Sequence, residues 1–342
     1  MLATVKRPGG TLQMSLAERN PSLPVGRTAA SVAGASATVS QAGRPPVHSR
    51  RSPHPLARPG PRRHRPRTAF VLAGGASLGA MQAGMLRALF ECGIEPDMLV
   101  GTSAGALNAA YVASRPPTVE TAKQLARVWR AVHRNDVFPI HPRTMIGGLA
   151  SHRDHLVPDR PLRRLISRHL ELERLEHARV PLHLVTLDLL GGREVLLSDG
   201  PAVEAVLAAA SIPGVLPPVR WGEYLLVDGG VVNNTPISHA VGLGAERIYV
   251  LPTDDPEVRG RPMAPQGALD AAVHAFTLLV GARLETDLAR YAQEAELVVL
   301  PAANPRRVQP TDFDHADHLI ASALHAAKGV LEEAIVPAAI AA

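Results

Sequence analysis

Apolar residues beyond position 67 fall into two kinds of run. Short runs of four or five apolar residues, bounded by polar residues, glycine or proline, are typical of buried strands. Longer stretches repeat apolar residues with the period of a helix. The two kinds alternate, which predicts an α/β domain with a mostly parallel sheet. Strands are expected at 69–73, 98–101, 182–186, 194–197, 224–227, 248–251 and 297–300, and helices at 79–92, 104–113, 119–132, 203–210, 264–292 and 315–335.

The first 67 residues show neither period. They contain ten prolines and twelve Lys and Arg residues against a single acid, Glu18, so their net charge is +11, whereas that of the whole chain is +5. Without periodic apolar positions, a segment cannot bury enough surface to offset the entropy lost on ordering. We therefore predict a disordered, basic, Arg/Pro-rich segment at 1–67 and a folded domain at 68–342.

The role of this basic segment is open to several interpretations. An Arg-rich arm can bind anionic lipid or nucleic acid, and an Arg-rich, acid-poor composition also suits a transit peptide. A solvated tail or a misplaced start codon explains the same composition. Because no aromatic residue precedes Phe70, the segment lacks the stacking groups that a single-strand binder uses. A nucleic-acid partner is therefore not expected.

Composition narrows the class of protein further. Hydrophobic residues make up 46% of the 342 residues and aromatic residues 3%, which excludes fibrous and wholly disordered proteins and predicts a core of Ala, Val and Leu. No run of eighteen apolar residues occurs, so a transmembrane helix is not expected. Cys92 is the single cysteine, which excludes an internal disulfide and a Cys-rich metal site and fits a reducing compartment. We expect a cytoplasmic protein, or one that contacts a membrane peripherally.

The strongest local motif is the sequence GTSAG, from Gly101 to Gly105. It stands between an expected strand and an expected helix. A sharp turn from strand to helix strains the central residue, and glycines two positions before and after it remove side chains that would collide. The hydroxyl of Ser103 would project at a helix N-terminus, where backbone N–H groups favour developing negative charge. A GxSxG sequence also occurs by chance, but this setting predicts a nucleophilic serine.

A second glycine-rich turn, GGASLG from Gly74 to Gly79, follows the expected strand at 69–73. Such a turn exposes backbone N–H groups to an anion at a helix start. As a dinucleotide site it is incomplete, because Ala76 replaces the second glycine of the fingerprint and no acidic residue ends a second strand about 20 residues on. We expect instead that the N–H groups of Gly75 and Ala76 hold the oxyanion of a substrate on Ser103.

A third motif is Asp228-Gly229-Gly230, at the end of the expected strand at 224–227. An acid followed by two glycines is often only a turn. A serine nucleophile needs a base, however. A carboxylate at the C-terminal edge of the same sheet is placed to accept the proton of Ser103 directly.

These three motifs occur in the order found in the patatin-like phospholipase family, which residues 68–252 resemble. The neighbouring sequences AASIP at 209–213, LPP at 216–218 and NNTP at 233–236 also match bacterial members. The resemblance implies a three-layer α/β/α sandwich with a mostly parallel central sheet. It further implies a dyad without histidine and a surrounding for the oxyanion: Ser103 is the nucleophile, Asp228 is its base, and Gly74, Gly75 and Ala76 surround the oxyanion.

Two positions depart from the family pattern. Leu78 stands where members usually carry Arg or Lys before the last glycine of the loop. Without that cation near the substrate, a preference for an anionic phosphate head group is not expected. Ala76 stands where the pattern has a glycine. If the loop requires a positive φ at that position, the Cβ of Ala76 costs about 1 kcal/mol.

Fifteen histidines permit two other interpretations. The pair His315 and His318, and the HRDH sequence at 152–155, are spaced like metal ligands, but neither has the companion ligands of a known site. We therefore expect no metal and no organic cofactor. In a Ser-acid-His triad the histidine would come last in the chain, as His239 or His274. Both lie in stretches expected to be helical, with no strand-end loop to present them.

Two apolar segments, at 137–140 and 145–149, lie between expected helices. Core packing is the simplest explanation for both. A lid, or an interfacial segment in contact with lipid, is the alternative.

Together these features predict a serine acyl hydrolase that cleaves lipid carboxyl esters, of the phospholipase A or lysophospholipase type, through an acyl-enzyme intermediate. Its substrate would be a lipid or acyl ester, with peripheral contact to a membrane or micelle. An esterase or thioesterase acting on soluble acyl esters is the alternative within this class. A non-catalytic scaffold that uses the fold to bind a membrane is the alternative outside it.

Overall fold

The computed structural model describes residues 6–7, 10–11, 65–139, 154–254 and 268–340. Met1–Gln13 and Pro66–Ala342 belong to one compact unit, and Met14–Arg65 forms a second, of which only Arg65 is described. The disorder expected for 1–67 therefore stays a prediction over most of that range. Within it, β1 (Lys6–Arg7) pairs with β2 (Gly10–Thr11) and, in parallel, with β10 (Glu296–Val299), so these four residues belong to the sheet.

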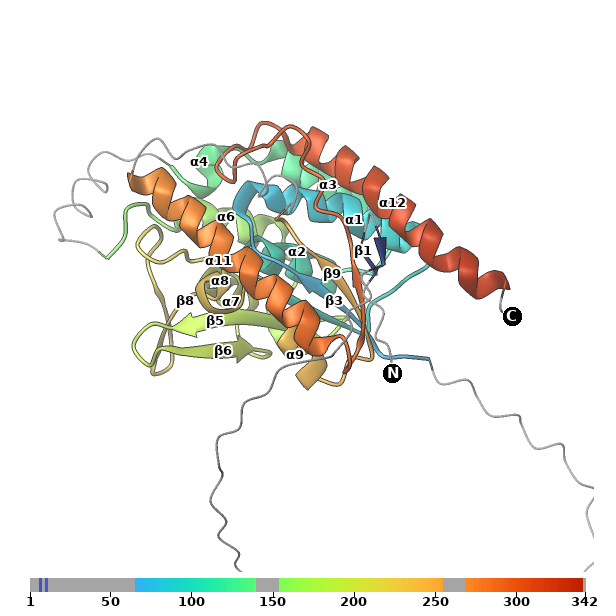
Figure 1. The fold of residues 1–342 in the computed structure, drawn as a ribbon. Helices are drawn as coiled ribbons and strands as arrows, with labels where there is room; N and C mark the ends of the chain where they lie inside the picture. The colour runs from blue at the N-terminus through green and yellow to red at the C-terminus, as the bar shows by residue number, and fades with distance from the viewer. Residues whose placement is uncertain (1–5, 8–9, 12–64, 140–153, 255–267, 341–342) are drawn as a thin grey trace, which may run out of the picture. The chain divides into compact units, whose positions relative to one another are not determined.

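One sheet runs through the larger unit, in the order β2-β1-β10-β9-β3-β4-β5-β8-β7, with β6 paired to β5. Figure 1 shows β9, β3, β5 and β6 of this sheet. Neighbouring strands are parallel from β10 to β5. Beyond β5 the sheet continues with antiparallel strands. The bounds are β3 (Thr68–Leu72), β4 (Met98–Thr102), β5 (Leu182–Asp188), β6 (Arg193–Leu197), β7 (Val219–Trp221), β8 (Tyr224–Asp228) and β9 (Arg247–Leu251).

The seven strands expected from the apolar runs are all present, and the mostly parallel central sheet is confirmed. The strand β7 is additional. It has three residues, and the middle one, Arg220, is exposed. Such a short strand contains no apolar run for the pattern to detect.

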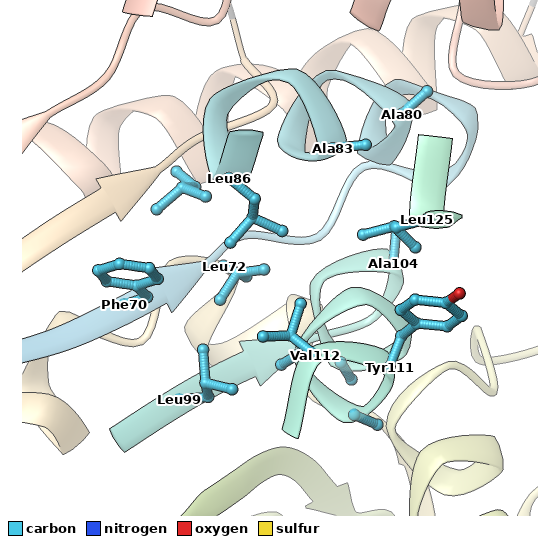
Figure 2. Close-up of a cluster of buried hydrophobic side chains, with 14 of the residues drawn as sticks. Phe70, Leu72, Ala80, Ala83, Leu86, Leu99, Ala104, Tyr111, Val112 and Leu125 are labelled. Carbon is cyan, nitrogen blue, oxygen red and sulfur yellow. The ribbon is translucent and has the colours of Figure 1, made fainter. Parts of the chain in front are cut away.

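Helices cover both faces of the sheet, because successive side chains along a strand point to opposite faces. Phe70 and Leu72 of β3 belong to one hydrophobic cluster, and Ala69 and Val71 belong to another. Figure 2 shows the first cluster, with Leu72 and Leu99 of the sheet beside helical side chains. The helices of the first cluster are α1 (Ala80–Glu91), α2 (Ala104–Ala113), α3 (Val119–Ala131), α6 (Arg160–His169), α7 (Ala202–Ala209) and α12 (Ala316–Ile340).

The second cluster contains residues of α9 (Ile237–Gly242) and α11 (Ala268–Tyr291), so the domain has the expected three layers. The six expected helices are present, and α12 continues to Ile340. The helix α6 is not predicted by the apolar pattern, because it carries four arginines and buries only Leu162 and Ile166. Short turns that the pattern does not predict are α4 (Arg134–Val137), α8 (Gly230–Asn233), η1 (Ala76–Gly79) and η2 (Leu175–His177).

Candidate active site

Ser103 is the single residue between β4 and α2, as the motif predicts. Its backbone has φ 56° and ψ −124°, a sparsely populated conformation that costs about 1–3 kcal/mol for a residue with a side chain. The turn is so tight that a Cβ on Gly101 would lie 2.6 Å from the carbonyl oxygen of Gly105. The N–H of Ser103 donates to the carbonyl of Ala209 on α7 at 3.0 Å, and this bond helps to hold the strained residue.

Asp228 reaches Ser103 because two strands share one edge of β5. The strand β4 pairs in parallel with the first four residues of β5, and β8 pairs antiparallel with its last three. The strand β6 pairs with the last five residues of β5 and takes the other edge. A strand has only two hydrogen-bonding edges. Because β6 occupies one edge of β5, β4 and β8 share the other edge and lie end to end along it. Their C-terminal residues, Thr102 and Asp228, stand opposite the consecutive residues Val185 and Thr186.

The sequence predicts a carboxylate at the C-terminal edge of the sheet. Asp228 is the last residue of its strand, and β8 runs antiparallel to β5, so it approaches β4 head-on. The two motifs meet because both strands stop at the same level of β5.

The Asp228 carboxylate is buried, with 4% of its surface exposed. The N–H of Gly230 donates to its Oδ1 at 2.8 Å, and the hydroxyl of Ser103 lies close enough to lower its pKa. Burial raises the pKa of this carboxyl from 3.8 to about 6, and the interactions with Ser103 and Gly230 offset part of that rise. Asp228 is therefore ionised at neutral pH and is a stronger base than an exposed carboxylate. A Cβ on Gly229 would lie 2.6 Å from the carbonyl oxygen of Val185, so the turn leaves no room for a side chain there.

The candidate triad histidines have other surroundings. His239 on α9 contacts Oε1 of Glu194 through its Nε2 at 2.5 Å, and the same oxygen accepts a hydrogen bond from Asn233. The side chain of His274 lies outside the described residues. Within the described part of the chain, the Asp228 carboxylate accepts a hydrogen bond from the N–H of Gly230, and no histidine is bonded to it.

The glycine-rich loop between β3 and η1 is tied down at Gly74. Its N–H donates to the carbonyl of Asn234 at 3.1 Å, and its carbonyl accepts hydrogen bonds from the side chains of Asn234 and Thr253. A Cβ on Gly74 would lie 2.9 Å from the Cβ of Ser103, so the loop passes directly beside the serine. Gly74 can position the loop, but its N–H is already bonded.

The next two residues, Gly75 and Ala76, have backbone N–H groups that can donate to a substrate. No acceptor for the N–H of Gly75 or Ala76 exists among the described residues, and both residues are partly exposed. Ala76 has φ 49°, so the expected cost of about 1 kcal/mol for its Cβ applies. Leu78 packs, partly buried, against the first hydrophobic cluster, so this position places an apolar group beside the loop.

Three buried polar side chains fix both ends of this loop. Gln82 donates to the carbonyl of Ala73 at 2.8 Å, before the loop, and Asn108 donates to the carbonyl of Gly79 at 2.9 Å, after it. Asn108 also donates to Oε1 of Gln82 and accepts from the indole N–H of Trp129, both at 2.8 Å. The loop is therefore held by a continuous hydrogen-bonded network between α1, α2 and α3.

Sequence reasoning does not identify these positioning residues. Gln82 and Asn108 are the single side-chain amides of the apolar helices α1 and α2. Because a buried amide requires hydrogen-bond partners, a lone amide in an apolar helix is a sequence signal that could have identified them. Asn234 lies in the NNTP sequence that follows the acid motif. Thr253 carries no local signal, because its partner Gly74 is 179 positions away.

Replacing Asn108 with Leu should lower the free energy of unfolding by about 3 kcal/mol, because the carbonyl of Gly79, the amide of Gln82 and the indole of Trp129 each lose a buried partner. Urea unfolding monitored by circular dichroism would measure the change. The matched control is Asn135→Leu at an exposed position of α4, which should change the free energy by less than about 0.5 kcal/mol. Equal stability of the two variants would contradict a structural role for the network.

The candidate metal-ligand histidines that are described, His315 and His155, each contact one aspartate. His315 contacts Asp312 at 2.9 Å, and His155 contacts Asp154 at 2.7 Å. Among the described residues, no group of three or more His, Cys, Asp or Glu side chains could hold a metal ion. His152 lies outside the described residues.

The apolar segment at 137–140 is described only as far as Pro139. Phe138 packs edge-on against Phe313, with 6.2 Å between ring centroids, which favours core packing for this part. The segment at 145–149 lies outside the described residues. None of the helices in the described part of the chain has both the length and the apolar character needed to cross a bilayer.

Comparison with solved structures finds similarity to several larger proteins. VipD from Legionella pneumophila is 14% identical, with a TM-score of 0.43 over 78% of this chain and 67% of that one. Human GIVD cytosolic phospholipase A2 is also 14% identical, with a TM-score of 0.40 over 80% of this chain and 59% of that one.

Curated relatives share part of the sequence. Patatin-like phospholipase domain-containing protein 7 of Mus musculus is 30% identical over 191 residues, which are 54% of this chain and 13% of that protein. An uncharacterized NTE family protein of Mycobacterium tuberculosis is 31% identical over 173 residues, which are 49% of this chain and 27% of that protein. The matched region thus spans less than a third of the length of these relatives.

A family model decides the assignment. The model described as patatin-like phospholipase matches residues 70–241, half of the chain. This range includes the glycine-rich loop, the strained turn at Ser103 and the acid motif at Asp228. The chain therefore belongs to the patatin-like phospholipase family.

Proposed function

We propose that this protein is a serine acyl hydrolase that cleaves the carboxyl ester of a lipid, of the phospholipase A or lysophospholipase type. The observation that carries the proposal is the placement of Ser103, at a strained turn, beside the buried carboxylate of Asp228. A strained backbone and a buried charge both cost folding free energy, and such costs cluster at active sites. Family membership supports the lipid substrate class.

In the acylation step, Oγ of Ser103 forms a bond to the ester carbonyl carbon while its proton passes to Asp228. The carbonyl π electrons move onto the carbonyl oxygen. The N–H groups of Gly75 and Ala76 and the N-terminus of α2 would stabilise that charge. When the C–O bond to the leaving alcohol breaks, Asp228 returns the proton to that alcohol.

In the deacylation step, water replaces the alcohol. Asp228, again ionised, accepts a proton from the water as its oxygen attacks the acyl carbon. The bond between the acyl carbon and Oγ of Ser103 then breaks, and the proton passes from Asp228 to the serine. A fatty acid leaves, and every proton transfer uses the same carboxylate.

A fluorophosphonate probe should label Ser103, because only an activated serine attacks phosphorus at a useful rate. Peptide mass spectrometry would locate the adduct. Ser103→Ala should abolish labelling, whereas Ser167→Ala, at an exposed position of α6, should leave it unchanged. A folded wild-type protein that resists the probe would instead favour the non-catalytic scaffold.

Substrate comparison then tests the class of ester. A lipid hydrolase should cleave long-chain phospholipid or lysophospholipid in micelles with a higher kcat/KM than soluble short-chain esters. The reverse order would assign the protein to the esterases or thioesterases that act on soluble acyl esters.

A further inference from the structure

We propose that Glu194, on β6, is a positioning residue for the reaction. It acts through Asn233, which holds the motifs of the site together, and it does so from the face of the sheet opposite the Asp228 carboxylate. This inference rests on the proposed function, because it takes Ser103 and Asp228 as the reacting groups. It assigns a role in catalysis to a side chain that lies outside the motifs.

Asn233 and Asn234 contact all three motifs. The carbonyl of Asn233 accepts a hydrogen bond from the hydroxyl of Thr102, in the nucleophile motif, at 3.0 Å. The N–H of Asn233 donates to the carbonyl of Gly229, in the acid motif, at 2.8 Å. The next residue, Asn234, holds Gly74 of the glycine-rich loop through its carbonyl and its side chain. The two asparagines therefore link the nucleophile turn, the acid turn and the loop.

The side chain of Asn233 is fixed by two N–H donations. Asn233 is 1% exposed, and its Nδ2 donates to Oε1 of Glu194 at 2.8 Å and to the hydroxyl of Ser238 at 2.9 Å. Its Oδ1 has no hydrogen-bond partner among the described residues. Because a hydrogen bond to a carboxylate is roughly twice as strong as one between neutral groups, Glu194 is the stronger of the two anchors.

The carboxylate of Glu194 is itself held in place. Nε2 of His239, on α9, lies 2.5 Å from the same oxygen that accepts from Asn233. Burial alone would raise the pKa of Glu194, but the hydrogen bonds with His239 and Asn233 outweigh it and lower that pKa below its usual value. Glu194 is therefore ionised at neutral pH. A glutamine at position 239 can donate to the same oxygen, so His239→Gln should leave this anchor intact.

Glu194 and Asp228 lie on opposite faces of the sheet. Side chains two positions apart on a strand point to the same face. Two positions from Glu194 on β6, Leu196 packs against the second hydrophobic cluster. Two positions from Asp228 on β8, Leu226 belongs to the first cluster. The sheet therefore separates Glu194 from the reacting atoms, so Glu194 can affect the reaction only through the residues that it holds.

Ser103 is held from both faces of the sheet. Its strained backbone persists only where the surroundings over-determine it. Beside the first cluster, its N–H donates to the carbonyl of Ala209. The hydroxyl of Thr102, which aligns with the second-cluster residues of β4, donates to Asn233. Loss of Glu194 would loosen Asn233 and so release one of these two holds.

Glu194→Leu should lower kcat for p-nitrophenyl butyrate on the order of 10²-fold, the effect of misplacing a catalytic group by about 1 Å. KM should change little, because acylation and deacylation both use Asp228 and slow together. Glu194→Gln keeps an oxygen that can accept from Asn233, so it should retain most of the activity. Steady-state kinetics of the three proteins would measure this pattern, which a loss of stability alone does not produce.

The matched control is His183→Leu. His183 lies on β5, two positions before Val185 of the second cluster, and contacts the hydroxyl of Ser198 after β6 at 2.7 Å. This variant removes a polar contact between β5 and the end of β6 that is separate from the side-chain hydrogen bonds of Asn233. It should lower the free energy of unfolding without lowering kcat.

Thr102→Val tests the same link from its other end, because it removes the hydroxyl that donates to Asn233 and keeps the shape of the side chain. It should lower kcat. Combined with Glu194→Leu, it should lower kcat by less than the product of the two separate factors, because both changes break one chain of contacts. If the leucine variant does not fold, Glu194→Ala takes its place in the same cycle.

Hydrogen exchange, measured by mass spectrometry, separates this role from the chemistry. Peptides that contain Thr102 or Gly229 should exchange faster in Glu194→Leu than in the wild type or in His183→Leu. This faster exchange, in a protein that neither hydrolyses esters nor reacts with the fluorophosphonate, would refute the proposed function and keep Glu194 as the residue that holds the motifs. Wild-type kcat and wild-type exchange in a folded Glu194→Leu enzyme would overturn the role of Glu194 and keep the function.

Discussion

Asp228→Asn should lower kcat for ester hydrolysis by about as much as Ser103→Ala does, on the order of 10⁴-fold or more. The amide keeps the size of the carboxylate and an oxygen to accept the N–H of Gly230, but it cannot take the serine proton. In a triad, by contrast, the acid only orients a histidine, and its loss leaves a residual rate that follows another base. Steady-state kinetics of both variants on p-nitrophenyl butyrate would measure the comparison.

The matched control for this substitution is Asp188→Asn. Asp188 ends β5, is also 4% exposed and lies 3.5 Å from Arg193, so its replacement tests the effect of losing a buried carboxylate elsewhere. It should keep most of the activity. Substantial turnover by a folded Asp228→Asn enzyme, or loss of activity in a folded His239→Gln enzyme, would contradict the dyad.

The second large effect concerns pH. Because Asp228 must be ionised to accept the serine proton, kcat/KM should fall about tenfold per pH unit below a midpoint near 6. An exposed carboxylate would give a midpoint near 3.8. The midpoint is shifted upward because burial favours the protonated form of Asp228, which is inactive. A pH profile of kcat/KM for a soluble ester would measure the midpoint, and a flat profile down to pH values near 4 would contradict Asp228 as the base.

Unfolding must be excluded as the cause of this loss of activity at low pH. The pH dependence of the stability that Asp228 contributes provides the control. Between 3.8 and about 6, folded Asp228 holds a proton that the unfolded chain releases. The contribution of this group to stability therefore falls as pH rises through that window and stays constant above it. Urea unfolding should show that the stability of the wild type relative to Asp228→Asn decreases from pH near 4 to pH near 6, opposite to what acid unfolding at this site would cause.

Much of the local structure is readable from the sequence because it depends on near neighbours. The apolar runs place seven strands, including β3 and β4, and the GTSAG motif predicts the strained residue between β4 and α2. Glycines at positions 101 and 105 leave room for that turn, so the motif predicts the strained backbone of Ser103. The positive φ of Ala76 follows in the same way from the loop pattern. The helix α6 is missed, because its four arginines hide the two residues that it buries.

Only the tertiary structure decides how the site is assembled. The contact between Ser103 and Asp228 depends on β4 and β8 meeting end to end along β5, and pairing register is a property of three strands together, not of any one of them. The bond that occupies the N–H of Gly74 comes from Asn234, 160 positions away. The sequence determines which residues can do the chemistry, because strain and motif are local. The fold determines which of them touch, because long-range pairing is set by packing and hydrogen bonding across the whole sheet.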